Sequence, residues 1–164
     1  MQSATSRAPE PSATPAVMRM HDVGFPVAAE LLARFDLRLR QVPDGAAIPG
    51  SYWGDTEAGV IGNTVYARDD TPLHSLLHEA CHLIVLPLAR RLAVHTNATD
   101  SMAEEDATCY LQIVLADELP GFGRARQLAD MDAWGYSFRL GSARAWFEHD
   151  AADAQAFLRT RGLL

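Results

Sequence analysis

Residues Thr71 to Pro87 read TPLHSLLHEACHLIVLP, and they carry the strongest structural signal in the sequence. Thr71 is a typical N-cap residue, Pro72 suits the first helical position, and Pro87 forces an end. Apolar residues recur between them at the spacing of one helical face: Leu73, Leu76, Leu77, Ala80, Leu83, Ile84 and Leu86. The sequence therefore predicts an amphipathic helix that ends near Pro87.

This helix contains the pattern His-Glu-x-x-His, with His78, Glu79 and His82. Residues four apart lie one turn above each other, so both imidazoles can bind one tetrahedral Zn²⁺. Glu79 is rotated about 100° round the axis, away from the ion but within reach of a water on it. Because zinc lowers the pKa of such a water towards about 7, Glu79 can take its proton. The pattern predicts a zinc-activated water with Glu79 as general base.

A catalytic zinc site that keeps one position for water needs a third protein ligand. The candidates lie in an irregular segment and in the helix predicted from Ser101 to about Leu119: His95, Glu104, Glu105 and Asp106. Glu104 also fits a capping box that begins at Ser101. That alternative would direct its carboxylate to the backbone instead of to a metal.

Helical periodicity places Glu104 and Glu105 on different faces of the predicted helix. Glu104 lies three residues before Ala107 and so aligns with the apolar stripe of its helix. Glu105 aligns instead with Thr108 and Gln112, which we interpret as a solvent-like face. We therefore predict Glu104 as the third ligand, and Glu105, Asp106 and His95 remain the alternatives.

His74 extends the histidine stripe by one turn, but it lies about 12 Å along the axis from His82. We predict that His74 lies behind the ligands or at the surface. A purely structural zinc site, closed by His95 or Cys81, is a competing interpretation. Cys81 projects about 100° away from the adjacent His82 around the helix, which is poor geometry for sharing an ion.

Composition and charge exclude several functional classes. The 164 residues are 48% hydrophobic and 21% charged, as expected for an ordinary folded domain. The net charge is -7, and every basic residue is an arginine without a basic run, so no direct nucleic-acid or membrane surface is expected. No apolar run is long enough to span a bilayer, and the amino end lacks a secretory signal. A cytoplasmic protein is the expectation.

The chain is predicted to hold one zincin-like domain, residues 17–164, after a disordered tail from Met1 to Ala16 that is rich in Ser, Thr, Ala and Pro. A first helix is predicted from Pro26 to about Arg40, and a strand from Gly59 to Arg68, which Gly62 and Asn63 interrupt. Later helices are expected over three regions: 124–131, the residues after Ser142, and 151–161. The predicted fold class is α+β, mainly helical, with a small antiparallel or mixed sheet beside the active-site helix.

A second motif lies in the helix that starts near Ser101: Glu104, Ala107, Thr108, Tyr110, Leu111, Val114 and Leu115. With the zinc motif, it resembles small gluzincin-type zinc metallopeptidases of the ImmA/IrrE family. There a strand leads into the His-Glu-x-x-His helix, and a later helix opens with Glu-x-x-Ala-Asn-x-Phe-Ala-x-x-Leu-Leu. The resemblance covers about residues 59–115. It departs at Cys81, where glycine is common, at Thr108 for asparagine and at Tyr110 for phenylalanine.

The resemblance implies a zinc peptidase with His78, His82 and Glu104 as metal ligands. Glu79 would be the general base and then the acid towards the leaving amine. It also implies that an extended peptide adds alongside the strand region 59–68, and that a protein or peptide such as a DNA-binding transcriptional repressor is the substrate. The alternative is a non-catalytic interaction module on a metallopeptidase scaffold that contacts a transcriptional regulator. The intact Glu79 argues against this alternative.

An oxyanion donor is also needed for peptide hydrolysis. The candidates in the sequence are Tyr52, Tyr66, His95 and Tyr110. Tyr110 sits where a core residue is expected, and the sequence does not choose among the four.

Overall fold

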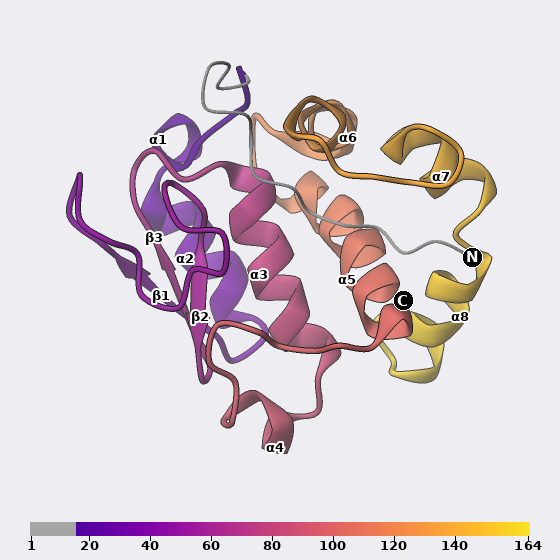
Figure 1. The fold of residues 1–164 in the computed structure, drawn as a ribbon, viewed down its shortest axis with the longest axis horizontal. Coiled ribbons are helices and arrows are strands. Elements are labelled where there is room, and N and C mark those ends of the chain that lie inside the picture. The colour runs from indigo at the N-terminus through magenta and orange to yellow at the C-terminus, as the bar shows by residue number, and fades with distance from the viewer. Residues whose placement is uncertain (1–15) are drawn as a thin grey trace.

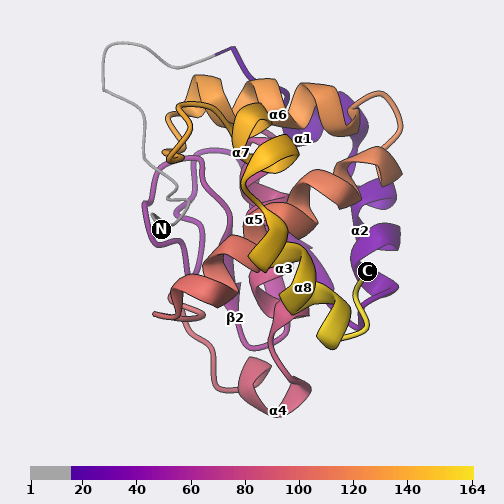
Figure 2. The ribbon, with the colours of Figure 1, turned by 90° about the vertical axis from the view of Figure 1, so that its right-hand side faces the viewer.

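The computed structural model describes residues 16–164, so the predicted tail lies outside the described residues except for Ala16. Helix α3 (Leu73–Val85) runs through the middle, with the sheet on one side and α5 (Met102–Leu115) on the other (Figure 1). Turned by 90°, the molecule shows α6 (Gly123–Trp134) at one end and α4 (Leu88–Arg91) at the other, with α8 (Ala152–Thr160) beside α5 (Figure 2). Helix α3 carries the predicted zinc motif, with His78, Glu79 and His82, and this zinc-motif helix is therefore enclosed on both sides.

The predicted fold class is confirmed, since a small mixed sheet accompanies a mainly helical domain. The remaining helices are α1 (Met20–Val23), α2 (Phe25–Ala33), the 3-10 helix η1 (Ala116–Glu118) and α7 (Ala143–His149). Ser142 caps α7 as expected, because its hydroxyl accepts a hydrogen bond from the backbone of Ala145. None of the helices in residues 16–164 combines the length and apolar character needed to cross a membrane.

The zinc-motif helix begins one residue later than predicted. Pro72, not Thr71, is the N-cap, and Leu73 is the first helical residue. The Thr71 hydroxyl instead accepts a hydrogen bond from the backbone N–H of Arg68 at 2.9 Å, which closes the turn that leads into the helix. The helix ends at Val85, two residues before Pro87.

The sheet has the strand order β1-β3-β2. β2 (Gly59–Ile61) and β3 (Thr64–Ala67) form an antiparallel hairpin, and Gly62 and Asn63 make its two-residue turn, with Gly62 at a φ of 58°. The stretch predicted as one interrupted strand is thus two strands. β1 (Arg38–Gln41) pairs with β3 in parallel.

The helix predicted from Pro26 to Arg40 is too long, because α2 ends at Ala33 and β1 follows. Asp36 adopts a φ of 59°, in the left-handed region that aspartate tolerates better than most residues. The backbone N–H of Leu37 bonds to Leu32 O, and that of Asp36 to Ala33 O, as in a Schellman motif. This helix-ending turn is what redirects the chain into β1.

The outer edge of β2 is covered by other parts of the chain. Val60 donates its N–H to Gly50 O and accepts at its carbonyl from Thr96 N, at 3.2 and 3.0 Å. The crossing at residue 50 needs glycine at position 59, because a Cβ there would lie 1.9 Å from Pro49 O. Both backbone hydrogen-bonding groups of Val60 are therefore already occupied.

Candidate metal centre

Helix α3 brings His78 and His82 together. Their ring centroids are 4.6 Å apart and the ring planes are nearly perpendicular. Both residues are buried, at 4% and 9% exposure, because α3 lies between the sheet and α5. Glu79, the next residue after the first histidine, is half-buried, and burial raises the pKa of its carboxyl. The pattern predicted from the sequence therefore folds into one compact polar site.

Glu105 of α5 supplies the third group of this site. Its two carboxylate oxygens lie 3.1 Å from His78 Nε2 and 3.0 Å from His82 Nε2. The ligand atoms of the three residues all lie within 4.8 Å of one another, so together they could hold a metal ion. The Glu105 side chain keeps 21% exposure, which leaves the cluster in contact with solvent.

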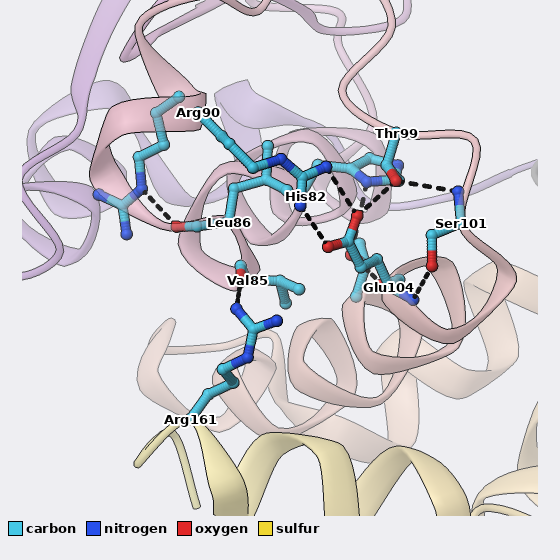
Figure 3. A network of polar contacts seen from close by, with 10 residues as sticks. His82, Val85, Leu86, Arg90, Thr99, Ser101, Glu104 and Arg161 are labelled. Atoms are coloured by element: carbon cyan, nitrogen blue, oxygen red, sulfur yellow. Dashed lines mark hydrogen bonds and ion pairs between the residues drawn. The ribbon is translucent and has the colours of Figure 1, made fainter.

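The prediction of Glu104 as the third ligand is corrected by this arrangement. The Glu104 carboxylate accepts two hydrogen bonds from the Arg90 guanidinium, at 2.6 and 3.1 Å, and one from the Thr99 hydroxyl (Figure 3). Arg90 thereby lowers the pKa of Glu104. The Ser101 hydroxyl caps the helix by accepting from Glu104 N. Glu104 thus links Arg90 and Thr99, which precede α5, to the first turn of that helix, and its carboxylate lies with them and not with the histidines.

The other ligand candidates also lie elsewhere. His95 is exposed, and its Nδ1 lies 2.8 Å from the hydroxyl of Thr96. Asp106 is buried and lines a cavity between α5 and α8, together with Phe157. Cys81 is buried and stands outside the group that could hold a metal ion. Of the alternatives left open by the sequence, Glu105 is the one that lies in the group of described residues that could hold a metal ion.

The face of α5 interpreted as solvent-like faces α3 instead. Thr108 and Gln112 are both fully buried. The Gln112 Oε1 atom lies 2.7 Å from His78 Nδ1, and the Thr108 hydroxyl lies 3.4 Å from His82 Nδ1. A polar stripe on α5 thus meets the histidine stripe on α3 at the same helical spacing. This match between two polar stripes is the signal in the sequence that could have identified Glu105.

His74 lies behind the ligands, not at the surface. It is fully buried, its Nδ1 lies 3.1 Å from the Tyr136 hydroxyl, and its ring lies 4.9 Å from that of Trp134. Burial lowers the pKa of His74 well below its usual value, so the ring is neutral. Tyr136, which the sequence analysis did not consider, also places its ring 5.8 Å from that of His78.

Glu57 is a second residue that the sequence analysis missed. It is 4% exposed, and its Oε1 accepts a hydrogen bond of 2.8 Å from the indole N–H of Trp134. Its Oε2 is buried without a hydrogen-bond partner among residues 16–164. Burial raises the pKa of Glu57 to about 7, despite the Trp134 hydrogen bond, and the charge of Glu79 adds to the rise.

His74, Trp134, Tyr136 and Glu57 form an inner cluster behind the ligand group of His78, His82 and Glu105. The pKa shifts in the ligand group differ from those in the inner cluster. Burial alone would raise the pKa of Glu105, but His78 and His82 lower it well below its usual range. Burial alone would lower the pKa of His78, but Tyr136 and Glu105 outweigh it, so that pKa is raised. The group thus favours a negatively charged Glu105 beside a positively charged His78.

The tyrosines proposed as oxyanion donors make other contacts. Tyr52 is 61% exposed and packs its ring against Trp53, while Tyr110 stacks on Phe147 with centroids 4.6 Å apart. Tyr66 lies half-buried on β3.

The expected addition of a peptide alongside residues 59–68 meets an obstacle at β2, where the chain itself occupies both backbone hydrogen-bonding groups of Val60.

Comparison with known proteins gives no relative: no protein-family model matches the chain, and no curated protein or solved structure matches it either.

Proposed function

We propose that this chain is a zinc-dependent peptidase that hydrolyses a peptide bond with a metal-activated water. The observation that carries the proposal is the convergence of two imidazole nitrogens and one carboxylate on a single point, with Glu79 beside them on the same helix. Two histidines and one carboxylate are the protein ligands of a known class of catalytic zinc site. The resemblance to ImmA/IrrE peptidases supports the same activity.

The donor set fits zinc. Imidazole nitrogen and carboxylate oxygen are ordinary zinc ligands, and a site with three protein ligands leaves a fourth position for water. A bound zinc ion lowers the pKa of such a water to about 7. His78, His82 and Glu105 would hold the ion, and the partial exposure of Glu105 gives solvent a route to the cluster.

Glu79 is the residue that moves protons in this proposal. Because Glu79 directly follows His78, its side chain leaves the helix about 100° round the axis from the ligand stripe, from where it would reach a water on a metal held by that stripe. Glu79 takes a proton from the attacking water, and it returns a proton to the leaving amine. A protein or peptide is the proposed substrate, with a DNA-binding repressor suggested by the resemblance alone.

The test compares wild type with Glu79→Gln, using a mixture of fluorogenic peptides and a measurement of zinc per chain. Wild type is expected to bind about one zinc and to cleave a peptide, while Glu79→Gln keeps the zinc and loses about 10²–10⁴-fold in turnover. Glu30→Gln, a change at an exposed glutamate of α2, is the matched control and should retain activity. Equal turnover of wild type and Glu79→Gln would reject the mechanism. Zinc uptake without any cleavage, together with stable capture of an uncleaved protein, would favour the interaction module.

A further inference from the structure

We infer that Gln112 and Thr108 are positioning residues that fix which ring nitrogen each histidine presents to the metal. This inference rests on the proposed metal site and deepens it. A metal-binding histidine normally donates its other ring N–H to a neighbouring acceptor, which sets the tautomer and the direction of the ring. Here both acceptors come from α5, the helix that also carries Glu105.

The orientation of the Gln112 amide follows from its second contact. Gln112 Nε2 lies 3.1 Å from the backbone carbonyl of His74, and a carbonyl oxygen can only accept a hydrogen bond. The NH₂ end of the amide must therefore face His74 O, and the oxygen end faces His78 Nδ1 at 2.7 Å. Since that oxygen also only accepts, His78 Nδ1 carries the hydrogen. The lone pair of neutral His78 is then on Nε2, the atom that faces Glu105.

The hydrogen bonds of Thr108 fix the tautomer of His82 in the same way. The Thr108 hydroxyl has one hydrogen, which it donates to the backbone carbonyl of Glu104 at 2.8 Å. Only its lone pairs remain for His82 Nδ1 at 3.4 Å, so His82 Nδ1 is the donor. Neutral His82 then also presents the lone pair of Nε2 to Glu105.

With both rings neutral, the two contacts give a site in which every inward-facing atom is an electron-pair donor. Two Nε2 lone pairs then meet two carboxylate oxygens at 3.0–3.1 Å, and these atoms repel one another unless a cation, either a metal ion or a ring proton, lies among them. Gln112 and Thr108 are neutral, so they orient the rings without adding a negative charge. The closer contact, at Gln112, is the stronger of the two.

The first experiment measures the zinc affinity of the full chain by competition with a chromophoric chelator. Gln112→Met removes the acceptor at similar length and should weaken binding by about 10–100-fold. Thr108→Val keeps the side-chain shape and should weaken binding less, because its contact is longer. Gln112→Glu restores an acceptor and should recover most of the lost affinity.

Gln127 offers a matched control on α6. It is also a fully buried glutamine, and neither end of its amide has a hydrogen-bond partner among residues 16–164. Gln127→Met should leave zinc affinity unchanged, although it changes the same chemical group in the core. Equal affinities of wild type and Gln112→Met, or equal losses in Gln112→Met and Gln127→Met, would overturn the inference.

A second measurement needs no variant. Long-range ¹H–¹⁵N correlation of the histidine rings in the zinc-loaded wild type should show a hydrogen on Nδ1 of both His78 and His82. A metal on Nδ1 of either ring would overturn the inference. If the wild type takes up no zinc, the peptidase proposal fails, yet the same spectrum of the metal-free chain still shows whether Nδ1 of each ring carries a hydrogen. Nδ1–H on both rings supports the positioning role, and a ring whose Nδ1 carries no hydrogen refutes it.

Discussion

Two environments along one face of α3 show how the same residue type acquires different chemistry. His78 and His82 face the polar stripe of α5 and share the Glu105 carboxylate. His74, one turn earlier, packs against the rings of Trp134 and Tyr136 and lies 3.1 Å from the Tyr136 hydroxyl. The spacing of the three histidines is regular, so the difference comes from the elements packed against α3. The residues packed against each histidine therefore set its chemistry.

Two carboxylates, Glu105 and Glu57, show the same contrast between environments. Glu105 lies between two imidazoles, which lower its pKa well below the usual range. Glu57 lies in the inner cluster, where its burial beside Trp134 raises its pKa to about 7. The partly exposed ligand group favours the ionised form of Glu105, and the buried inner cluster favours the protonated, neutral form of Glu57. Three experiments test this distinction.

The largest effect is expected from Glu105→Gln, compared with Glu104→Gln at the adjacent position. Glu105→Gln removes a proposed metal ligand and should weaken zinc binding by more than the roughly 100-fold typical of outer partners. Glu104→Gln should lower the melting temperature, because Arg90 loses its bidentate acceptor, but leave zinc affinity within about twofold. Chelator competition and thermal unfolding measure both. The reverse ranking of zinc affinities would restore Glu104 as the ligand.

The second effect concerns the pH dependence of stability in the metal-free chain. The pKa of Glu57 is about 7 in the folded state against 4.5 as the reference value, so the folded chain holds a proton that the unfolded chain has lost between these pH values. Stability should therefore fall as pH rises from 4.5 to about 7, by about 3 kcal/mol in total.

Glu57→Gln isolates this contribution. Urea unfolding with a chelator present, below pH 4.5 and above pH 7, should show a smaller loss of stability in Glu57→Gln than in wild type. Groups far from Glu57 titrate equally in both proteins, so the difference between the two curves reports Glu57 and its interaction with Glu79. Parallel curves would show that folding does not shift the pKa of Glu57.

The smallest effect is expected from His74→Phe. The Tyr136 hydroxyl loses a partner, but the unpartnered His74 Nε2 is removed as well, so the net loss of stability should be only about 1 kcal/mol. Zinc affinity should stay near that of wild type, because His74 is not among the ligands. A large loss of zinc binding in a folded variant would contradict the separation of the two environments.

Much of the fold was predictable because its signals are local. The zinc-motif helix, the cap at Ser142 and the hairpin break at Gly62 and Asn63 each follow from neighbouring residues. The overlong first helix shows the limit of such signals. Leu39 fits a helical spacing, but it equally fits the alternating pattern of a short strand between Arg38 and Arg40.

The candidate site was predictable in part. His78 and His82 come together because their spacing fixes them on one helical face, while Glu104 was preferred because it aligned with an apolar stripe. A metal ligand faces other polar groups, so the stripe of Glu105, Thr108 and Gln112 was the better guide. Residues such as Glu57 and Tyr136 come from distant parts of the chain, and only the packing of α3 against its neighbours reveals them.

The cover over β2 has a consequence for how copies of this protein behave together. An open strand edge is a template on which another chain can pair, and this is a common route to aggregation. At Val60 that template is already used, by Gly50 and Thr96. The opposite edge, β1, carries the exposed charged side chains of Arg38 and Arg40. Each edge is thus protected against intermolecular pairing, one by its own backbone and the other by charge.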